Sequence, residues 1–178
     1  SWLIHRDGCI QVKLDVKKDM EFPFLPRFGL RLFLDQSLDR VRYCGMGPDE
    51  SYPDKHQASW HGIFEGDVRT MHRPYLKPQE YGSHWDCSWC EISGEEMSFQ
   101  ASSKEGFMFQ ACEYTQEELS EKAHDFELKE VGCTVLCLDH NQSGIGSGSC
   151  GPQLLEKYQF NEPEFSRTWV ITPGKRKE

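Results

Sequence analysis

The segment Ile10-Gln-Val-Lys-Leu-Asp-Val16 places an apolar side chain at every second position. Successive side chains of a β-strand point to opposite faces of the sheet, so this period predicts a strand with one buried face. The same alternation recurs in Leu30-Arg-Leu-Phe-Leu34, where three leucines share one face. Both segments are therefore predicted to be strands that cover a hydrophobic core.

Similar short runs, rich in β-branched and aromatic residues, recur along the chain between glycine and proline turns. We predict about nine strands, at residues 10–16, 29–34, 40–44, 87–92, 97–101, 107–114, 134–138, 155–160 and 167–171. One short helix is expected over residues 115–122, where Thr115 can act as N-cap and Glu118 can complete a capping box. Many strands with little helical period are typical of an all-β, antiparallel sandwich or barrel.

Length and charge limit the class of protein. The 178 residues are enough for one domain with a substantial core. The net charge of -9, from 29 acidic and 20 basic residues, argues against a nucleic-acid partner, which requires clustered lysine and arginine. No apolar run approaches the roughly 20 residues of a membrane helix, and the first residues lack the order of a signal peptide. We expect a cytoplasmic protein without a membrane or nucleic-acid partner.

The eight cysteines are interpreted as small buried apolar residues, because disulfide frameworks belong to smaller secreted domains. Only Cys87 and Cys90 have a metal-like spacing, and the second pair that a structural zinc site requires is missing. In a regular strand these two side chains would also point to opposite faces. We therefore predict no metal site and no cofactor in this chain.

Three motifs resemble catalytic signatures but lack the required context. Asn161-Glu-Pro163 has the form of a glycosidase acid/base residue, yet a catalytic barrel needs roughly 250 residues, so a turn is predicted. Ser147-Gly-Ser-Cys-Gly151 and Gly144-Ile-Gly-Ser-Gly148 lack the strand and helix that a nucleophile elbow or a dinucleotide loop needs. No catalytic residue is predicted.

Sugar binding remains open, because five tryptophans and six tyrosines can stack on sugar rings as well as fill a core. Two long loops, residues 45–55 and 141–152, are the predicted places for binding residues.

Several longer strings of residues occur in a fixed order. They are Pro26-Arg-Phe-Gly-Leu30, Tyr43-Cys-Gly-Met-Gly-Pro-Asp-Glu-Ser-Tyr-Pro-Asp-Lys55, Pro74-Tyr-Leu-Lys-Pro-Gln-Glu-Tyr-Gly82 and Asp86-Cys-Ser-Trp89. Further matches are Phe107-Met-Phe-Gln-Ala111, Tyr114, Leu119, His124, Leu138-Asp139 and residues 144–152. Together they resemble the C-terminal small-chain region, domain 5, of the long bacterial β-galactosidases of glycoside hydrolase family 2. The resemblance covers most of residues 26–160.

The resemblance implies an antiparallel β-supersandwich similar to galactose mutarotase, formed by residues 1–172 with further strands before residue 1, and a charged tail at 173–178. It implies a part of an enzyme that hydrolyses terminal β-D-galactosides such as lactose. The catalytic glutamates, with Mg²⁺ and Na⁺, would lie on a separate domain or large subunit of an oligomer, and the isolated chain would be inactive.

The resemblance also implies that the loop at residues 141–152 forms a wall of the sugar pocket. Well-known members carry a tryptophan on this loop where this sequence has Cys150. The predicted substrate-binding residues are Asp139, Gly146, Ser147, Ser149 and Cys150. Arg27 is as ready to pair with a carboxylate as to touch a ligand. The alternatives are a stand-alone carbohydrate-binding module and an aldose mutarotase, the latter using His124 and Asp139 as its pair.

Overall fold

The computed structural model describes residues 1–145 and 153–175. Within them, nine strands form one sheet in which all pairs are antiparallel. The strands are β1 (Trp2–Ile4), β2 (Ile10–Lys17), β3 (Arg27–Asp35), β4 (Arg40–Gly47), β5 (Trp60–Asp67), β6 (Ser83–Ser93), β7 (Met97–Cys112), β8 (Cys133–Gln142) and β9 (Glu164–Lys175). The prediction of an all-β, antiparallel fold is confirmed, while the likeness to galactose mutarotase stays a prediction.

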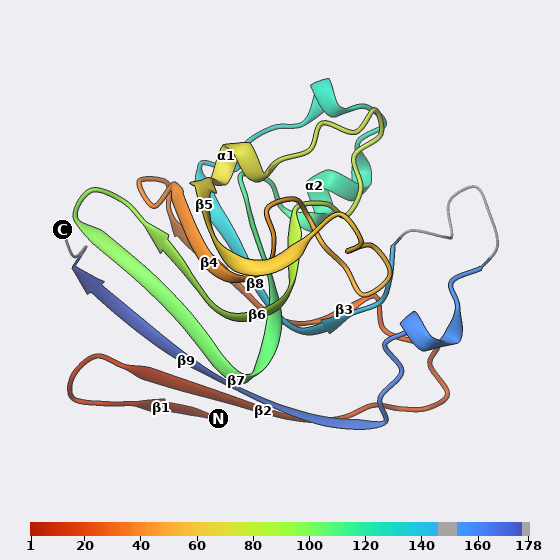
Figure 1. Ribbon diagram of the computed structural model, residues 1–178, viewed down its shortest axis with the longest axis horizontal. Coiled ribbons are helices and arrows are strands. Elements are labelled where there is room, and N and C mark those ends of the chain that lie inside the picture. The colour runs from red at the N-terminus through yellow and green to blue at the C-terminus, as the bar shows by residue number, and fades with distance from the viewer. Residues whose placement is uncertain (146–152, 176–178) are drawn as a thin grey trace.

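Strand β7 joins two parts of the sheet. Along one edge it pairs with β6, whereas its other edge pairs with β9 over residues 97–102 and with β8 over residues 108–112. The strand order is therefore β1-β2-β9-β7-β6-β4-β5, and β8 and β3 leave from the second half of β7. Figure 1 shows β1, β2 and β9 beside the first half of β7 and β8 and β3 beside the second.

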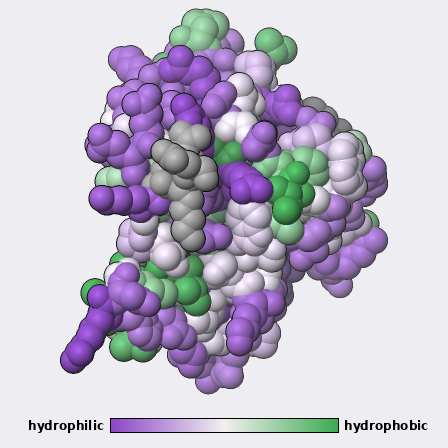
Figure 2. Space-filling view, turned by 60° about the vertical axis from the view of Figure 1, so that its left-hand side comes forward, coloured by the Kyte–Doolittle hydropathy of each residue, from purple (hydrophilic) through white to green (hydrophobic). Residues whose placement is uncertain are grey.

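The core lies between these two parts, because its largest cluster takes side chains from both. Trp169 and Ile171 of β9 lie in one cluster with Leu136 and Leu138 of β8. The predicted alternation is confirmed: Val12 is fully buried in β2, and the leucines of β3 alternate with exposed residues. Figure 2 shows a mainly hydrophilic surface on which hydrophobic areas are separated by polar ones.

Most predicted strands are present, and the predicted strands at residues 97–101 and 107–114 prove to be parts of the single strand β7, which ends at Cys112. Residues 155–160 do not form the predicted strand but contain the 3-10 helix η2 (Glu156–Tyr158). The apolar pattern there has another cause, since Phe160 is a buried residue that makes one isolated bridge to Leu25 while Leu155 is exposed. Strands β1 and β5 were not predicted from the sequence.

The helices are short. Helix α2 (Gln116–Glu121) confirms the expected one, with the Thr115 hydroxyl accepting from the Glu118 N–H at 3.1 Å. Glu118 does not complete the predicted capping box in the described structure. Its carboxylate accepts from the N–H of Lys129 at 2.9 Å and so joins α2 to the segment before β8. Helix α1 (Val68–Met71) and the 3-10 helix η1 (Asp125–Glu127) were not expected. No helix of the described residues is long and apolar enough to cross a membrane.

Cys87 and Cys90 correct one expectation. Both side chains lie in the hydrophobic core, not on opposite faces of β6, because the pairing register of β6 shifts on both sides of Cys87. The seven cysteines that the structure describes are free. Near the C-terminus, residues 173–175 continue β9 and pair with β7. The sequence analysis assigns these residues to the charged tail at 173–178.

Candidate functional site

Arg27, at the start of β3, forms two ion pairs with acidic residues from distant parts of the chain. Its Nη2 lies 2.5 Å from Oδ2 of Asp139, and its Nη1 lies 2.7 Å from Oε2 of Glu80. Burial acts to lower the pKa of the guanidinium, but Glu80 and Asp139 outweigh it and raise the pKa. Arg27 therefore stays charged and holds β3, β8 and the loop before β6 together.

Neutral groups also bind both carboxylates. Gln142 Nε2 donates to Asp139 Oδ2 at 2.9 Å and to the Ser83 hydroxyl at 3.0 Å. Ser83 in turn donates to Glu80 Oε1 at 2.8 Å, and the Tyr52 hydroxyl lies 3.4 Å from the same oxygen. We call these six residues the Arg27 network: Arg27, Tyr52, Glu80, Ser83, Asp139 and Gln142. Such mutual pairing satisfies polar groups that would otherwise be costly to bury.

A glycine makes this arrangement feasible. The register between β3 and β8 shifts between Phe28 and Gly29. A Cβ on Gly29 would collide with the carbonyl oxygen of Leu138 and would lie 2.8 Å from Oδ1 of Asp139. Only glycine permits β3 to approach β8 this closely beside the ion pair.

The first residues after β8 are bound by two segments, residues 25–26 and residues 158–160. Ser143 donates from its N–H to the Pro26 carbonyl at 2.9 Å and from its hydroxyl to the Leu25 carbonyl at 2.6 Å. The Ser143 hydroxyl also accepts from the N–H of Phe160 at 2.9 Å. Gly144 donates its N–H to the Tyr158 carbonyl at 2.9 Å. The chain that enters the loop at residues 141–152 therefore leaves the sheet in a fixed direction.

Asp54 adds a further contact to this loop stem. Its Oδ1 accepts from the N–H of Ile145 at 3.0 Å, and a Cβ on Gly144 would collide with the carboxylate. The backbone at residue 144 and the carboxylate of Asp54 therefore fit together only because residue 144 is a glycine. The sequence strings around Arg27, Asp54 and Glu80, far apart in the chain, converge on one loop stem.

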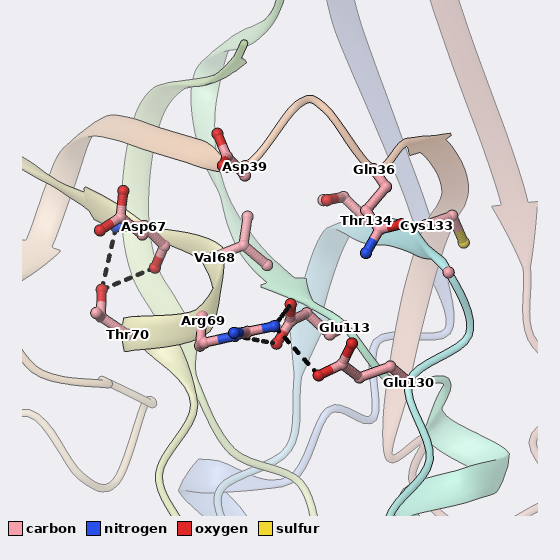
Figure 3. A pocket seen from close by; sticks show the side chains of 11 residues that line it. Gln36, Asp39, Asp67, Val68, Arg69, Thr70, Glu113, Glu130, Cys133 and Thr134 are labelled. Atoms are coloured by element: carbon pink, nitrogen blue, oxygen red, sulfur yellow. Dashed lines mark hydrogen bonds and ion pairs between the residues drawn. The ribbon is translucent and has the colours of Figure 1, made fainter.

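A separate hollow lies between α1 and the start of β8 and has a volume of about 430 Å³. Figure 3 shows Arg69 between two glutamates of this hollow, with Nη2 at 3.0 Å from Glu113 and 3.2 Å from Glu130. Asp39 and Asp67 also line it. These ion pairs tie α1 to the segment after β7, and none of the motif residues of the loop stem takes part.

A family model described as β-galactosidase small chain matches residues 1–171. The chain belongs to the β-galactosidase small-chain family. It is 44% identical over 162 residues to a β-galactosidase of Actinobacillus pleuropneumoniae and 39% identical over 168 residues to one of Staphylococcus xylosus. A β-galactosidase of Kluyveromyces lactis is 34% identical over 149 residues. These alignments cover 91%, 93% and 81% of this chain but only 16%, 17% and 14% of the relatives. The chain spans about a sixth of the length of the relatives that it matches.

The structure of this small-chain member places one of the predicted sugar-binding residues, Asp139. Its side chain is 4% exposed, and its oxygens are bound by Arg27 and Gln142. Its contact with sugar stays a prediction. The other four, Gly146, Ser147, Ser149 and Cys150, lie outside the described residues. Of the two roles expected for Arg27, the structure shows pairing with a carboxylate.

The remaining candidate residues have separate surroundings. His124 stacks on Phe126 and lies 3.4 Å from Glu127, whereas Asp139 belongs to the Arg27 network, so the structure does not bring the mutarotase-type pair together. Glu162, from the Asn-Glu-Pro motif, has a half-exposed side chain 3.4 Å from His140. In the described residues no group of three His, Cys, Asp or Glu side chains is arranged to hold a metal ion.

Sequence reasoning missed Ser83 and Gln142. Each is a single polar residue at a strand terminus. Ser83 lies outside the strings that the sequence analysis interpreted, and Gln142 lies in the predicted binding loop without being singled out there. Their burial is the only feature that identifies them, since both are at most 2% exposed.

Proposed function

We propose that this chain is a non-catalytic part of a β-galactosidase that hydrolyses terminal β-D-galactosides such as lactose. The loop at residues 141–152 forms a wall of the galactoside pocket, and the catalytic glutamates come from a separate domain or large subunit. The complete enzyme acts in the cytoplasm as an oligomer, and Mg²⁺ and Na⁺ belong to its catalytic part.

One observation carries the proposal: residues of the family's sequence strings meet at the stem of this loop. Arg27, Asp54 and Glu80 come from three different strings, and the segments that carry them bind residues 142–145 directly or through the Arg27 network. A loop that is held so firmly at its stem can present its tip in a defined position, as a binding wall requires. The small-chain family and its β-galactosidase members supply the substrate class.

The contribution of this chain is positioning. Glycoside hydrolysis needs two carboxyl groups that face each other across the scissile bond. Glu80 and Asp139 are both bound by Arg27, and Glu113 and Glu130 both pair with Arg69, so these carboxylates stabilise the fold. In the proposal, a partner domain supplies the acid and the nucleophile.

The direct experiment compares the full-length protein with the isolated chain on a chromogenic β-galactoside. We expect turnover by the former and none by the latter, and appreciable turnover by the isolated chain would contradict the division of roles.

A labelling experiment tests whether the loop at residues 141–152 lines the galactoside pocket. Cys150 in the full-length protein is alkylated with and without a saturating, non-hydrolysable thiogalactoside, and the modified peptides are quantified by mass spectrometry. We expect the galactoside to slow modification of Cys150 and to leave that of Cys9, a half-buried cysteine just before β2, unchanged. Equal rates at Cys150 in both samples, with hydrolysis fully inhibited, would show that the loop does not line the pocket.

A further inference from the structure

A small polar pocket lies where β7 changes its partner from β9 to β8. It has a volume of about 160 Å³ and is lined by side chains of β6, β7, β8 and β9, among them Trp85, Asp86, Glu105, His140, Asn141 and Arg167. Two unusual backbone positions border it, Asp86 with φ of 53° and Gly106 with φ of 70°. The bulge in β6 and the bend in β7 thus open a hollow in the middle of the sheet.

Arg167 of β9 gives this pocket an unmet hydrogen-bond donor. Its side chain is 10% exposed, and its Nε donates to Nδ1 of His140 at 3.0 Å. Its Nη1 is buried without a hydrogen-bond partner in the described part of the chain, and the nearest carboxylate oxygen, Oε2 of Glu105, is 3.7 Å away. Buried polar groups in folded proteins are nearly always paired, so this atom requires an explanation.

The partner of Arg167 does not offset its charge. Because His140 accepts through Nδ1, the proton of its ring is on Nε2, which lies 3.4 Å from Glu162. Burial, together with the charge of Arg167, lowers the pKa of His140, so the ring stays neutral. Burial also lowers the pKa of Arg167 itself, whereas the two carboxylates around Arg27 raise that of the other arginine. Of these two arginines, Arg167 retains the capacity for a further polar contact.

The charges around the pocket select the class of ligand. Asp86 and Glu105 carry two negative charges against the one positive charge of Arg167, which disfavours an anion. A hydroxyl group suits this mixture, since it can donate to a carboxylate and accept from a guanidinium at the same time. The volume corresponds to about five water molecules at about 30 Å³ each, the size of one sugar ring. The lining is mainly polar, as a ligand with hydroxyl groups on all sides requires, and Trp85 borders the pocket.

We propose that this pocket binds a neutral polyhydroxyl ligand of one sugar ring, through the guanidinium of Arg167 and the carboxylates of Asp86 and Glu105. The ligand is either a free monosaccharide or a sugar unit of the substrate. The proposal goes beyond the function proposed above, because the pocket is built from the described strands and not from the tip of the loop at residues 146–152.

The test titrates D-glucose and D-galactose into the full-length protein by calorimetry, with and without a saturating thiogalactoside. The variants are Arg167→Met, Asp86→Asn and Glu105→Gln. The last two change exposed carboxylates, and asparagine tolerates the positive φ at position 86, so they keep the test valid if Arg167→Met does not fold. Arg42→Met, which removes an arginine that lies over Trp89 outside the pocket, is the matched control.

We expect each pocket variant to weaken sugar binding by about tenfold or more, as the loss of a charge-assisted hydrogen bond would, and Arg42→Met to leave it unchanged. Binding that persists with thiogalactoside identifies a free monosaccharide as the ligand, and binding that thiogalactoside abolishes identifies a sugar unit of the substrate. No sugar binding by the parent protein, or an affinity in all three pocket variants equal to that of the parent protein, overturns the proposal. Failure of the proposed function has a different signature, because the same preparation would then not hydrolyse a β-galactoside.

Discussion

The carboxylate of Asp54 occupies the space that a Cβ on residue 144 would need, so Gly144 and Asp54 fit together only because residue 144 has no side chain. The same carboxylate accepts from the N–H of the next residue, Ile145, at 3.0 Å. The contact joins the loop at residues 45–55 to the loop at residues 141–152. The two long loops that the sequence marks as binding places are therefore one structural unit at their stems.

Gly144→Ala is expected to destabilise the chain by about 1–3 kcal/mol, because the added methyl must displace the Asp54 carboxylate. The measurement is urea denaturation of the purified chain, with galactoside hydrolysis by the full-length variant as a second readout that should fall. Gly174→Ala is the control, since its Cβ would meet Ser98 at an ordinary 3.6 Å. Equal denaturation midpoints for the two variants would contradict the role of the contact.

Arg27→Met is expected to cost about 3–5 kcal/mol, because it leaves the carboxylates of Glu80 and Asp139 without their cation in a mostly buried place. Denaturation of the purified chain measures the loss. Arg31→Met is the matched control, since Arg31 forms a more exposed pair with Glu117 and should have a small effect. A loss for Arg27→Met no larger than that of the control would show that the Arg27 network does not stabilise the fold.

The burial of His84 leads us to expect that the folded chain loses stability in mild acid. It is 1% exposed between Tyr43 and Phe109, and burial lowers its pKa to about 4 from 6.5. In the unfolded chain the ring binds a proton below pH 6.5, while in the folded chain it does so only below about pH 4. The folded state therefore loses up to about 3 kcal/mol as the pH falls through this window, and the stability is fully present above it.

The measurement is the free energy of unfolding of the chain at several pH values between 7 and about 4.5, compared with His84→Gln. We expect the variant to show a shallower pH dependence, whatever its stability at pH 7. His5→Gln, at an exposed position, should keep the slope of the parent chain. Parallel curves for His84→Gln and the parent chain would rule out His84 as the source.

The buried cysteines are expected to resist alkylation. Cys87 and Cys90 have no exposed surface, and burial raises the pKa of both thiols, so the reactive thiolate is scarce. Brief iodoacetamide treatment of the folded chain, followed by peptide mass spectrometry, should modify Cys9 well before either of them. In urea all three should react at similar rates, and fast labelling of Cys87 in the folded chain would contradict the buried position.

The sequence predicted those elements that obey a local rule. The alternating leucines of β3 and the Thr115 cap of α2 depend on neighbours in sequence, and both are present. The prediction of a strand at residues 155–160 was wrong because Phe160 is buried by packing after a helical turn. Apolar content alone does not distinguish such a turn from a strand. Strand β5 was missed because Gly62 and Gly66 interrupt its pattern, although its pairing with β4 supplies the register.

The candidate site shows the same limit. Arg27 could be identified from its sequence string, but its partners Glu80 and Asp139 could not. Pairing between distant strands brings them to Arg27. Gln142 and Arg167 carry no local signal, since their roles arise only where β7, β8 and β9 meet.

The position of β9 between β2 and β7 also sets an order of events during synthesis. Strand β2 pairs with β1 and with β9, so the β1–β2 hairpin reaches the rest of the sheet only through a strand made near the end of the chain. A two-stranded hairpin is marginally stable alone, and its docking requires closure of a very long loop. On the ribosome, Val12 of β2, which is fully buried in the folded chain and lies opposite Trp169, is therefore covered only after β9 has emerged.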